Sequence, residues 1–316
     1  MTASTSPVVQ LSGVRIDRGG RTILRDVSLE VPRGSITAVL GPSGSGKSTM
    51  LAALTGELRP VAGTVTLFGN PIPTGSRALL EMRRNVGVLL QGNGLLTDLS
   101  VAENVALPLR THTRLPAAVL QRLVQMKLHA VGLLAAADAW PREVSGGMAR
   151  RVALARALAL DHPRGRWRAG GRHGGVQGKC KGGGLWAAAV AGRRGWPGGG
   201  AGGGARARGW ARAPPLMIYD EPLTGLDPIA SGVIMSLIQR LNDSLGLTSI
   251  IVSHHVHETL PICDQAVVIA NGGIVFAGTP AQLQDSTDPL VQQFLHGQPD
   301  GPIAFDAAPR RDRSAA

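Results

Sequence analysis

One stretch, from Ser35 to Thr49, reads SITAVLGPSGSGKST and limits the folds open to this chain more than any other feature. An apolar run ends at Gly41, a G-x-x-x-x-G-K-[ST] pattern follows, and residues 49–58 suit a helix. In such a loop the backbone N–H groups point at phosphate groups, and the N-terminus of the helix adds positive potential. The stretch therefore predicts a nucleotide phosphate site between a strand and a helix.

The roles of individual residues in this loop follow from their chemistry. We expect the ammonium group of Lys47 to hold the β- and γ-phosphates and the hydroxyl of Ser48 to bind Mg²⁺. The predicted phosphate-binding residues are Gly41, Pro42, Ser43, Gly44, Ser45, Gly46, Lys47, Ser48 and Thr49. An ordinary glycine-rich turn is the alternative, and the strand before it and the helix after it argue against that reading.

A second stretch, MIYDEPLTGLDP at 217–228, places Asp220 and Glu221 directly after an apolar run. Such a pair is common at the solvated end of a strand, so it indicates little by itself. Together with a phosphate loop upstream it is typical of a nucleotide hydrolase.

Short apolar runs alternate with helical patterns along much of the chain. The expected strands are 64–68, 86–90, 216–219, 248–253 and 265–270, and the expected helices include 147–160 and 229–245. This alternation predicts an α/β fold with a mostly parallel sheet. Residues 92–160 contain no convincing strand and are expected to form an inserted helical subdomain. The last thirty or so residues are expected to be an irregular tail.

The net charge of +12 comes almost entirely from one segment, residues 164–213. This segment has eleven Lys or Arg and no Asp or Glu, which leaves a net charge of +1 for the rest (12 − 11). Because it is rich in Gly and has only Val176 and Val190 as β-branched residues, we expect it to be disordered. Translation of a GC-rich reading frame out of phase explains its composition, and a genuine basic arm is the alternative.

Other global features bear on the compartment. The two cysteines, Cys180 and Cys263, argue against a disulfide framework and fit a reducing compartment. The N-terminus lacks the basic start and apolar core of a signal peptide, and no run of about 18 apolar residues occurs. We therefore expect a cytosolic protein, or one that attaches to a membrane through a partner.

Five motifs in register carry a family resemblance. They are Lys47, Gln91, Ser145-Gly146-Gly147, Asp220-Glu221 and His254. In this order and spacing the chain resembles the ATP-binding subunits of ABC transporters, over roughly 8–160 and 214–285. The resemblance implies a P-loop NTPase core, 8–91 with 214–285, and a small antiparallel β region near the N-terminus. It further implies a helical subdomain at 92–163, with 164–213 as an insert and 286–316 as a C-terminal tail.

The resemblance also implies cofactors, an assembly and residue roles. The family binds ATP with Mg²⁺ between two subunits in a head-to-tail dimer, the phosphate loop of one facing the Ser145-Gly146-Gly147 turn of the other. Asp220 would bind Mg²⁺ through water, and Glu221 would accept a proton from the attacking water or orient it. His254 would contact the γ-phosphate. Gln91 would sense Mg²⁺ and the membrane subunit, with a plain loop residue as the alternative, and Asp227 matches the loop that crosses the dimer interface.

The chain departs from the family pattern at three positions. Val144 and Met148 replace the usual Leu and Gln beside the Ser-Gly-Gly turn. Arg18 stands where many members place an aromatic residue against adenine, and its planar guanidinium can also stack on a base. A zinc site in the cluster His254, His255 and His257 is a further alternative, although no second group of ligands with suitable spacing stands nearby.

Several longer segments resemble one branch of the family, the Mla (maintenance of lipid asymmetry) phospholipid transporter ATPases, also described as toluene-tolerance type. The segments are THTRLPAAVL, MKLHAVGL, SGGMARRVALARALAL, SHHVHETL and QQFLHGQPDGPIAF. This resemblance implies an inner-membrane permease, a periplasmic lipid-binding subunit and a small cytosolic STAS-domain partner, with the chain on the cytoplasmic side of the inner membrane. A soluble ABC ATPase that contacts nucleic acid through the basic insert is the alternative, and we expect no nucleic-acid partner.

Overall fold

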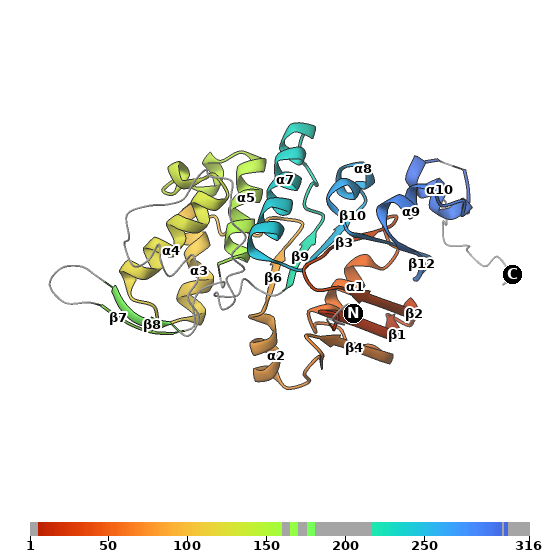
Figure 1. Ribbon diagram of the computed structural model, residues 1–316, viewed down its shortest axis with the longest axis horizontal. Helices are drawn as coiled ribbons and strands as arrows, with labels where there is room; N and C mark the ends of the chain where they lie inside the picture. The colour runs from red at the N-terminus through yellow and green to blue at the C-terminus, as the bar shows by residue number, and fades with distance from the viewer. Residues whose placement is uncertain (1–5, 160–164, 170–175, 181–215, 299, 303–316) are drawn as a thin grey trace, which may run out of the picture. The chain divides into compact units, whose positions relative to one another are not determined.

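The computed structural model describes residues 6–159, 165–169, 176–180, 216–298 and 300–302 (Figure 1). The chain divides into two compact units, the first formed by 1–72 with 250–316 and the second by 73–249. The subdomain boundaries expected at 91/92 and 213/214 both lie inside the second unit. Within the described residues, no helix combines the length and the apolar character needed to cross a bilayer.

An antiparallel sheet in the order β2-β1-β4-β5 opens the first unit. Its strands are β1 (Val9–Arg18), β2 (Arg21–Val31), β4 (Ala62–Leu67) and β5 (Asn70–Pro71). Buried and more exposed residues alternate along much of β1 and β2, which is the pattern of a sheet with one face in the core. This sheet confirms the small antiparallel β region expected near the N-terminus.

The other strands of the first unit follow the order β12-β11-β3-β10. They are β3 (Ile36–Leu40), β10 (Ser249–Ser253), β11 (Gln265–Ala270) and β12 (Gly273–Gly278). β11 pairs parallel with β3, whereas β12 returns antiparallel beside β11. β3 and β10 are buried along their whole length, so they appear in the sequence as continuous apolar runs.

Helices of the first unit follow these strands. α1 (Lys47–Leu54) comes after β3, and α8 (Val256–Thr259) with the 3₁₀ turn η3 (Leu260–Ile262) comes after β10. α9 (Pro280–Gln284) and α10 (Pro289–His296) follow β12. A cluster of buried apolar side chains joins β3 and β11 to α8, α9 and α10.

The expected irregular tail was wrong in its first part, because α10 lies within it. The carboxylate of Asp288 accepts hydrogen bonds from the backbone N–H groups of Leu290 and Val291, and Pro289 occupies the first helical position. Val291 and Leu295 are buried in the cluster with β3 and β11. Tertiary burial therefore stabilises a helix too short to be evident from its periodicity.

Cys263 packs against the same cluster, and its thiol donates a hydrogen bond to the carbonyl of Thr259 at 3.0 Å. Burial, with a smaller contribution from the charge of Asp264, raises the pKa of Cys263 to about 12. The raised pKa stabilises the folded state fully below the unfolded pKa of about 8.5, and this stabilisation is lost as the pH rises toward 12.

We expect the Cys263 thiol to be unreactive in the folded protein at pH 8. The thiolate fraction there is on the order of 10³ times smaller than in an unfolded chain. Iodoacetamide labelling of a Cys180→Ser variant, folded and in denaturant, measures this directly. Equal labelling rates in the two states would contradict the burial of the thiol.

The second unit contains the parallel pair β6 (Val86–Leu89) and β9 (Leu216–Asp220). α2 (Ser76–Arg83) precedes β6, and α7 (Pro228–Leu245) follows β9. The helical segment comprises α3 (Val101–His112), α4 (Ala117–Ala130), the 3₁₀ turns η1 (Leu134–Ala136) and η2 (Pro141–Glu143), and α5 (Gly146–Ala157). The expected strands and the helices at 147–160 and 229–245 are thus confirmed, with end shifts of a few residues. No strand occurs among the described residues between 92 and 159, as expected.

Side-chain caps define the starts of α3, α5 and α7 in this unit. Ser100 and Glu103 form a capping box on α3, with each side chain accepting from the other residue's backbone N–H. Asn104 is fully buried, and its amide bonds to the backbone at Leu96, Leu99 and Ser100. These bonds hold the loop before α3 against the helix.

Part of the basic insert differs from expectation. β7 (Gly165–Ala169) and β8 (Val176–Cys180) pair antiparallel over their whole length, so disorder was the wrong expectation for these two segments. Strand pairing uses backbone groups alone, and a sequence without a core pattern therefore does not prevent it. The rest of the insert lies outside the described residues.

Candidate nucleotide-binding and hydrolysis site

The phosphate loop of the first unit connects β3 to α1. Its glycines are required by the backbone: φ is +150° at Gly41, +81° at Gly44 and +104° at Gly46. A Cβ atom at Gly41 would stand 2.2 Å from the carbonyl oxygen of Ile269, and one at Gly46 would stand 2.6 Å from the Leu24 side chain. Only glycine fits these two positions, which confirms a loop that is tightly wound between its neighbours.

Lys47 lies at the first position of α1 and is 7% exposed. Its ammonium group donates hydrogen bonds to the carbonyls of Gly41 at 2.7 Å and Pro42 at 2.9 Å. The positive charge is thereby held over the loop. Ser48 is exposed and Thr49 is buried behind it.

The N-terminus of α1 has the properties of an anion site. Gly46 is its N-cap and no side chain caps it, so backbone N–H groups of the first turn are available to a ligand. The hydroxyl of Ser45 is buried and forms no hydrogen bond within the described residues. An orphaned buried donor beside uncapped amides fits a bound phosphate oxygen. Pro42, Ser43 and Gly44 complete the loop.

Two further predicted residues belong to the first unit. Arg18 ends β1, is exposed, and lies opposite Arg21 in the register of β1 and β2. His254 follows β10 and is exposed, with its ring centroid 4.3 Å from that of His255. His257 is exposed on α8.

The acidic pair of the second unit ends β9. Residues Leu216 to Tyr219 are fully buried, Asp220 is half-buried, and Glu221 is 8% exposed. Glu221 has φ of +47°, a left-handed conformation that costs a non-glycine residue free energy of about 1 kcal/mol or more. Strained backbone of this kind concentrates at functional sites because the surrounding structure must hold it.

The Ser145-Gly146-Gly147 turn begins α5. Ser145 is the N-cap, and its hydroxyl accepts a hydrogen bond from the N–H of Met148 at 3.3 Å. The amides of Gly146 and Gly147 stand in the first turn, where an anion is stabilised. A Cβ atom at Gly147 would be in van der Waals contact with the Ala230 side chain of α7, at 3.4 Å.

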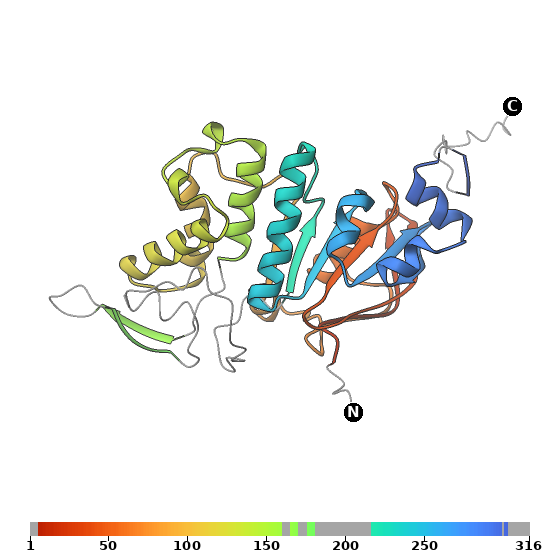
Figure 2. The same ribbon diagram turned by 45° about the horizontal axis from the view of Figure 1, so that its top comes forward.

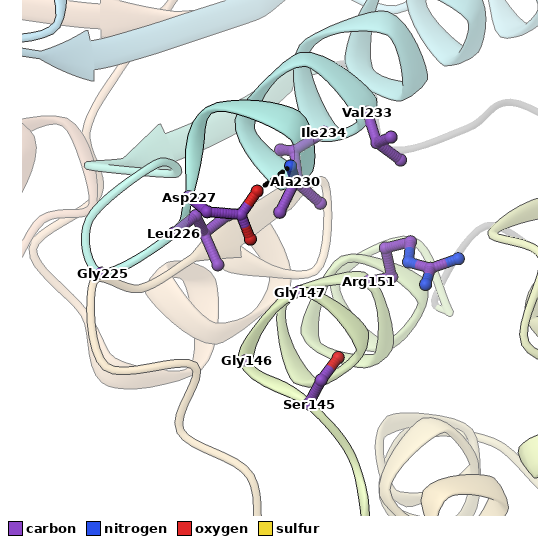
Figure 3. A pocket seen from close by; sticks show the side chains of 10 residues that line it. All are labelled: Ser145, Gly146, Gly147, Arg151, Gly225, Leu226, Asp227, Ala230, Val233 and Ile234. Atoms are coloured by element: carbon purple, nitrogen blue, oxygen red, sulfur yellow. Dashed lines mark hydrogen bonds between the residues drawn. The ribbon is translucent and has the colours of Figure 1, made fainter.

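A cavity of about 230 Å³ lies between the first turns of α5 and α7 (Figure 3). It is lined by Ser145, Gly146, Gly147, Arg151, Gly225, Leu226, Asp227, Ala230, Val233 and Ile234. The structure thus brings together two predicted motifs, the Ser-Gly-Gly turn and Asp227. A pocket of this size is too small for a whole nucleotide and suits only part of one.

Asp227 has a structural role that the sequence reading missed. Its carboxylate caps α7 by accepting hydrogen bonds from the N–H groups of Ile229 and Ala230, both at 2.9 Å. Figure 3 shows the bond from Ala230. The signal was present in the sequence, since Asp followed by Pro at the first helical position is a typical helix start.

Gln91 follows β6 and is exposed. Its segment is held by two arginines of α5 that the sequence reading did not single out. Arg150 donates to the carbonyls of Leu90 and Gln91, and Arg156 donates to those of Asn93 and Gly94. Burial lowers the pKa of both guanidinium groups. In the sequence, both arginines stand among the apolar residues of the predicted helix 147–160, and this placement was the signal that could have indicated their burial.

A larger cavity, about 770 Å³, lies over α3 and α4 and contains none of the predicted site residues. Glu103 on its lining is already engaged in the capping box. Cavity volume alone therefore does not identify the functional site. The chemistry of three features identifies it: the glycine-rich loop, the buried acid and the helix N-termini.

Comparisons with known proteins agree with this chemistry. Residues 24–163 match the family model described as ABC transporter. The chain is 40% identical over 299 residues to the intermembrane phospholipid transport system ATP-binding protein MlaF of Haemophilus influenzae, covering 94% of each chain.

Two solved structures share the fold. One is cbiO1 from Clostridium perfringens, part of the ABC transporter complex cbiONQ, with a TM-score of 0.69 and 22% identity over 89% of this chain and 92% of that one. The other is the dimeric ATP-binding cassette MJ0796 in a post-hydrolysis state with ADP and Pi, with a TM-score of 0.63 and 23% identity over 86% and 98%. These likenesses confirm the P-loop α/β fold class. The identity across nearly the whole chain, together with the motifs, shows that the chain belongs to the ATP-binding, ATP-hydrolysing proteins of the ABC transporter family.

Proposed function

We propose that this protein is the ATP-binding and ATP-hydrolysing subunit of an ABC transporter that moves phospholipid between the inner and outer membranes. The observation that carries the proposal is the 40% identity, over 94% of both chains, to a relative named for intermembrane phospholipid transport. The wound phosphate loop and the buried acid after β9 supply the chemistry such a subunit needs.

In this proposal the loop from Gly41 to Thr49 binds the phosphates of ATP. Lys47 neutralises the β- and γ-phosphates, and the uncapped amides of α1 and the orphaned hydroxyl of Ser45 bind phosphate oxygens. Arg18 stacks on the adenine. Ser48, Gln91 and Asp220 would hold Mg²⁺. Their hydroxyl, amide and carboxylate oxygens are ligands that this ion prefers, and the ion would neutralise charge on the phosphates.

Glu221 and His254 are the proposed catalytic residues. The oxygen of a water molecule attacks the γ-phosphorus, the bond to the bridging oxygen of ADP breaks, and the proton of the water passes to the Glu221 carboxylate. His254 contacts the γ-phosphate and helps place the water. The low exposure of Glu221 and its strained backbone support a functional role for this carboxylate.

The proposed active form is a head-to-tail dimer of two copies of this chain. Ser145, Gly146 and Gly147 would bind the γ-phosphate held by the neighbouring subunit, with Asp227 in the loop at the interface. Two observations support this: the first turn of α5 opens on a cavity sized for part of a nucleotide, and the MJ0796 cassette is a dimer. Arg151 on the cavity lining adds a positive charge.

The proposed partners follow from the Mla resemblance. They are an inner-membrane permease, a periplasmic lipid-binding subunit and a small cytosolic STAS-domain protein. The chain would then bind the cytoplasmic side of the inner membrane through the permease. The nucleic-acid alternative is not favoured, since it depends on the basic insert alone and the relative that matches across the chain is a transport protein.

A reconstitution experiment tests the proposal. We expect the tagged protein to co-purify from native membranes with a permease and phospholipid, and the complex in proteoliposomes to transfer labelled phosphatidylethanolamine in an ATP-dependent way. A Lys47→Ala complex is the matched control and is expected to lose this transfer, because ATP is no longer held. Full ATP-dependent transfer of a different substrate class, or isolation with RNA in place of a permease, would contradict the proposal.

A further inference from the structure

Arg150 is a buried cation whose hydrogen bonds go to backbone carbonyls. It is one of the buried residues of α5, and its exposed fraction is 2%. Its guanidinium group donates to three backbone carbonyls: Leu90 at 3.1 Å, Gln91 at 2.9 Å and Thr224 at 3.0 Å. Within the described part of the chain, no carboxylate forms a salt bridge with it.

Burying a charge costs free energy, and an apolar side chain of similar length would fill the same space without that cost. For Arg150, hydrogen bonds to backbone carbonyls offset this cost, and the geometry of the guanidinium group makes them possible. A guanidinium is a planar group with five N–H donors, so it can bond to carbonyls from different directions at once. Arg150 uses this property to join two loops that are far apart in the sequence.

The two loops carry proposed site residues. The first follows β6 and contains Gln91; the second follows β9, beginning at Glu221 and passing through Thr224. Arg150 itself stands five residues after Ser145 on the same helix. One side chain therefore connects the segments of Gln91, Glu221 and Ser145, which all belong to the second unit. Within this unit, α5 lies beside α7, the helix that follows the second loop (Figure 2).

Arg156 provides an internal comparison. It donates to Gly94 at 2.5 Å and Asn93 at 2.9 Å, so it holds the first loop only. Of these two arginines, Arg150 is the one that bonds to both loops. The two arginines therefore have separable roles, although they lie on one helix.

We propose that Arg150 is a positioning residue for ATP hydrolysis, which holds the loops of Gln91 and Thr224 in register with the helix that begins at Ser145. This inference rests on the proposed roles of Gln91, Glu221 and Ser145. A shift of about 1 Å in catalytic groups can lower turnover about a hundredfold, so loss of this connection acts mainly on kcat.

The test uses the full chain in its assembled transporter, with Arg150→Met, Arg150→Lys, Arg156→Met and Arg240→Met. Arg240 is the matched control, because it also donates to a backbone carbonyl, Ser236 at 3.3 Å, but is exposed on α7. Hydrogen exchange reports on each loop through amides bonded inside it: Asn93 to Leu90 and Thr224 to Glu221. ATPase assays give kcat and KM.

For Arg150→Met we expect kcat to fall by about 10- to 100-fold, with the KM for ATP changed by less than about threefold. Exchange should become at least about tenfold faster in both loops, and only in the first loop for Arg156→Met. Arg240→Met should behave as the unchanged protein. Arg150→Lys keeps the charge on a single donor atom, so at least one loop should still exchange faster.

Three outcomes would overturn the proposal. Unchanged exchange in both loops shows that Arg150 does not hold them, and faster exchange throughout 73–249 shows a general role in stability. Full recovery of kcat and exchange in Arg150→Lys shows that bridging by a guanidinium is not needed, and this variant also serves if Arg150→Met does not fold. If the unchanged protein hydrolyses no ATP, the proposed function fails while the exchange experiment still decides the role of Arg150.

Discussion

Replacing Glu221 by Gln is expected to lower the kcat for ATP hydrolysis by about 10²-fold or more and to leave ATP binding nearly intact. The amide has the same shape as the carboxylate, so the loop after β9 keeps its packing. It cannot accept the proton of the attacking water. The phosphate loop of the first unit is unchanged, and ATP is still held through Lys47 and the amides of α1.

The measurement is steady-state ATPase activity of the assembled transporter, together with the Kd of ATP for the same preparation. Glu81→Gln is the control, because this carboxylate is exposed on α2 and pairs only loosely with Arg77 at 3.7 Å. It is expected to retain full activity. Near-normal hydrolysis by Glu221→Gln would remove Glu221 from its assigned role.

Substitution of Ser145 is expected to lower hydrolysis by about 10²-fold or more in a pure preparation, because the amides at the start of α5 would no longer reach a neighbour's γ-phosphate. Two variants separate this effect from capping. Ser145→Arg fills the cavity and removes the cap, which costs about 1 kcal/mol. Ser145→Asp keeps an equally good cap but places a negative charge toward the phosphate. Both should be inactive, with the melting temperature lowered only for Arg.

Mixing experiments test whether the site is shared between subunits. In a Glu221→Gln background, in which bound ATP is not hydrolysed, we expect two occluded ATP molecules per dimer. A dimer of one Ser145→Arg and one Lys47→Ala subunit should occlude one, since one composite site has both halves intact and the other has neither. A dimer of one subunit with both substitutions and one without either should occlude none, since each composite site then has one broken half. One occluded ATP in that dimer, or wild-type hydrolysis by Ser145→Arg or Ser145→Asp, would show that each subunit holds its ATP alone.

Much of the fold was predictable because its signals are local. Strands buried along their whole length, such as β3 and β10, appear as apolar runs, and the phosphate loop has a pattern that few other structures require. The positive φ angles at Gly41 and Gly46 belong to the local geometry that makes the motif recognisable, whereas the close approach of Ile269 and Leu24 to these glycines depends on the tertiary structure. The order of the motifs was sufficient to predict the family.

Short helices and paired backbone segments were harder to predict from the sequence. The eight residues of α10 form a helix because Asp288 caps it and Val291 and Leu295 pack on β3 and β11. The pairing of β7 with β8 depends on backbone groups that every residue carries. Neither feature has a periodicity long enough to be read from a single sequence.

The candidate site divides in the same way. The sequence by itself determined which residues have the chemistry to bind phosphate, metal and water, for example Lys47, Ser145 and Glu221. These residues could be identified because each motif is contiguous, and one loop or one helix turn sets its spacing. Only the tertiary structure decided that Asp227 and the Ser-Gly-Gly turn line one cavity and that Arg150 joins the loops at Gln91 and Thr224. The reason is that backbone carbonyls are identical in every residue, so which of them meet a given side chain depends on the path of the whole chain.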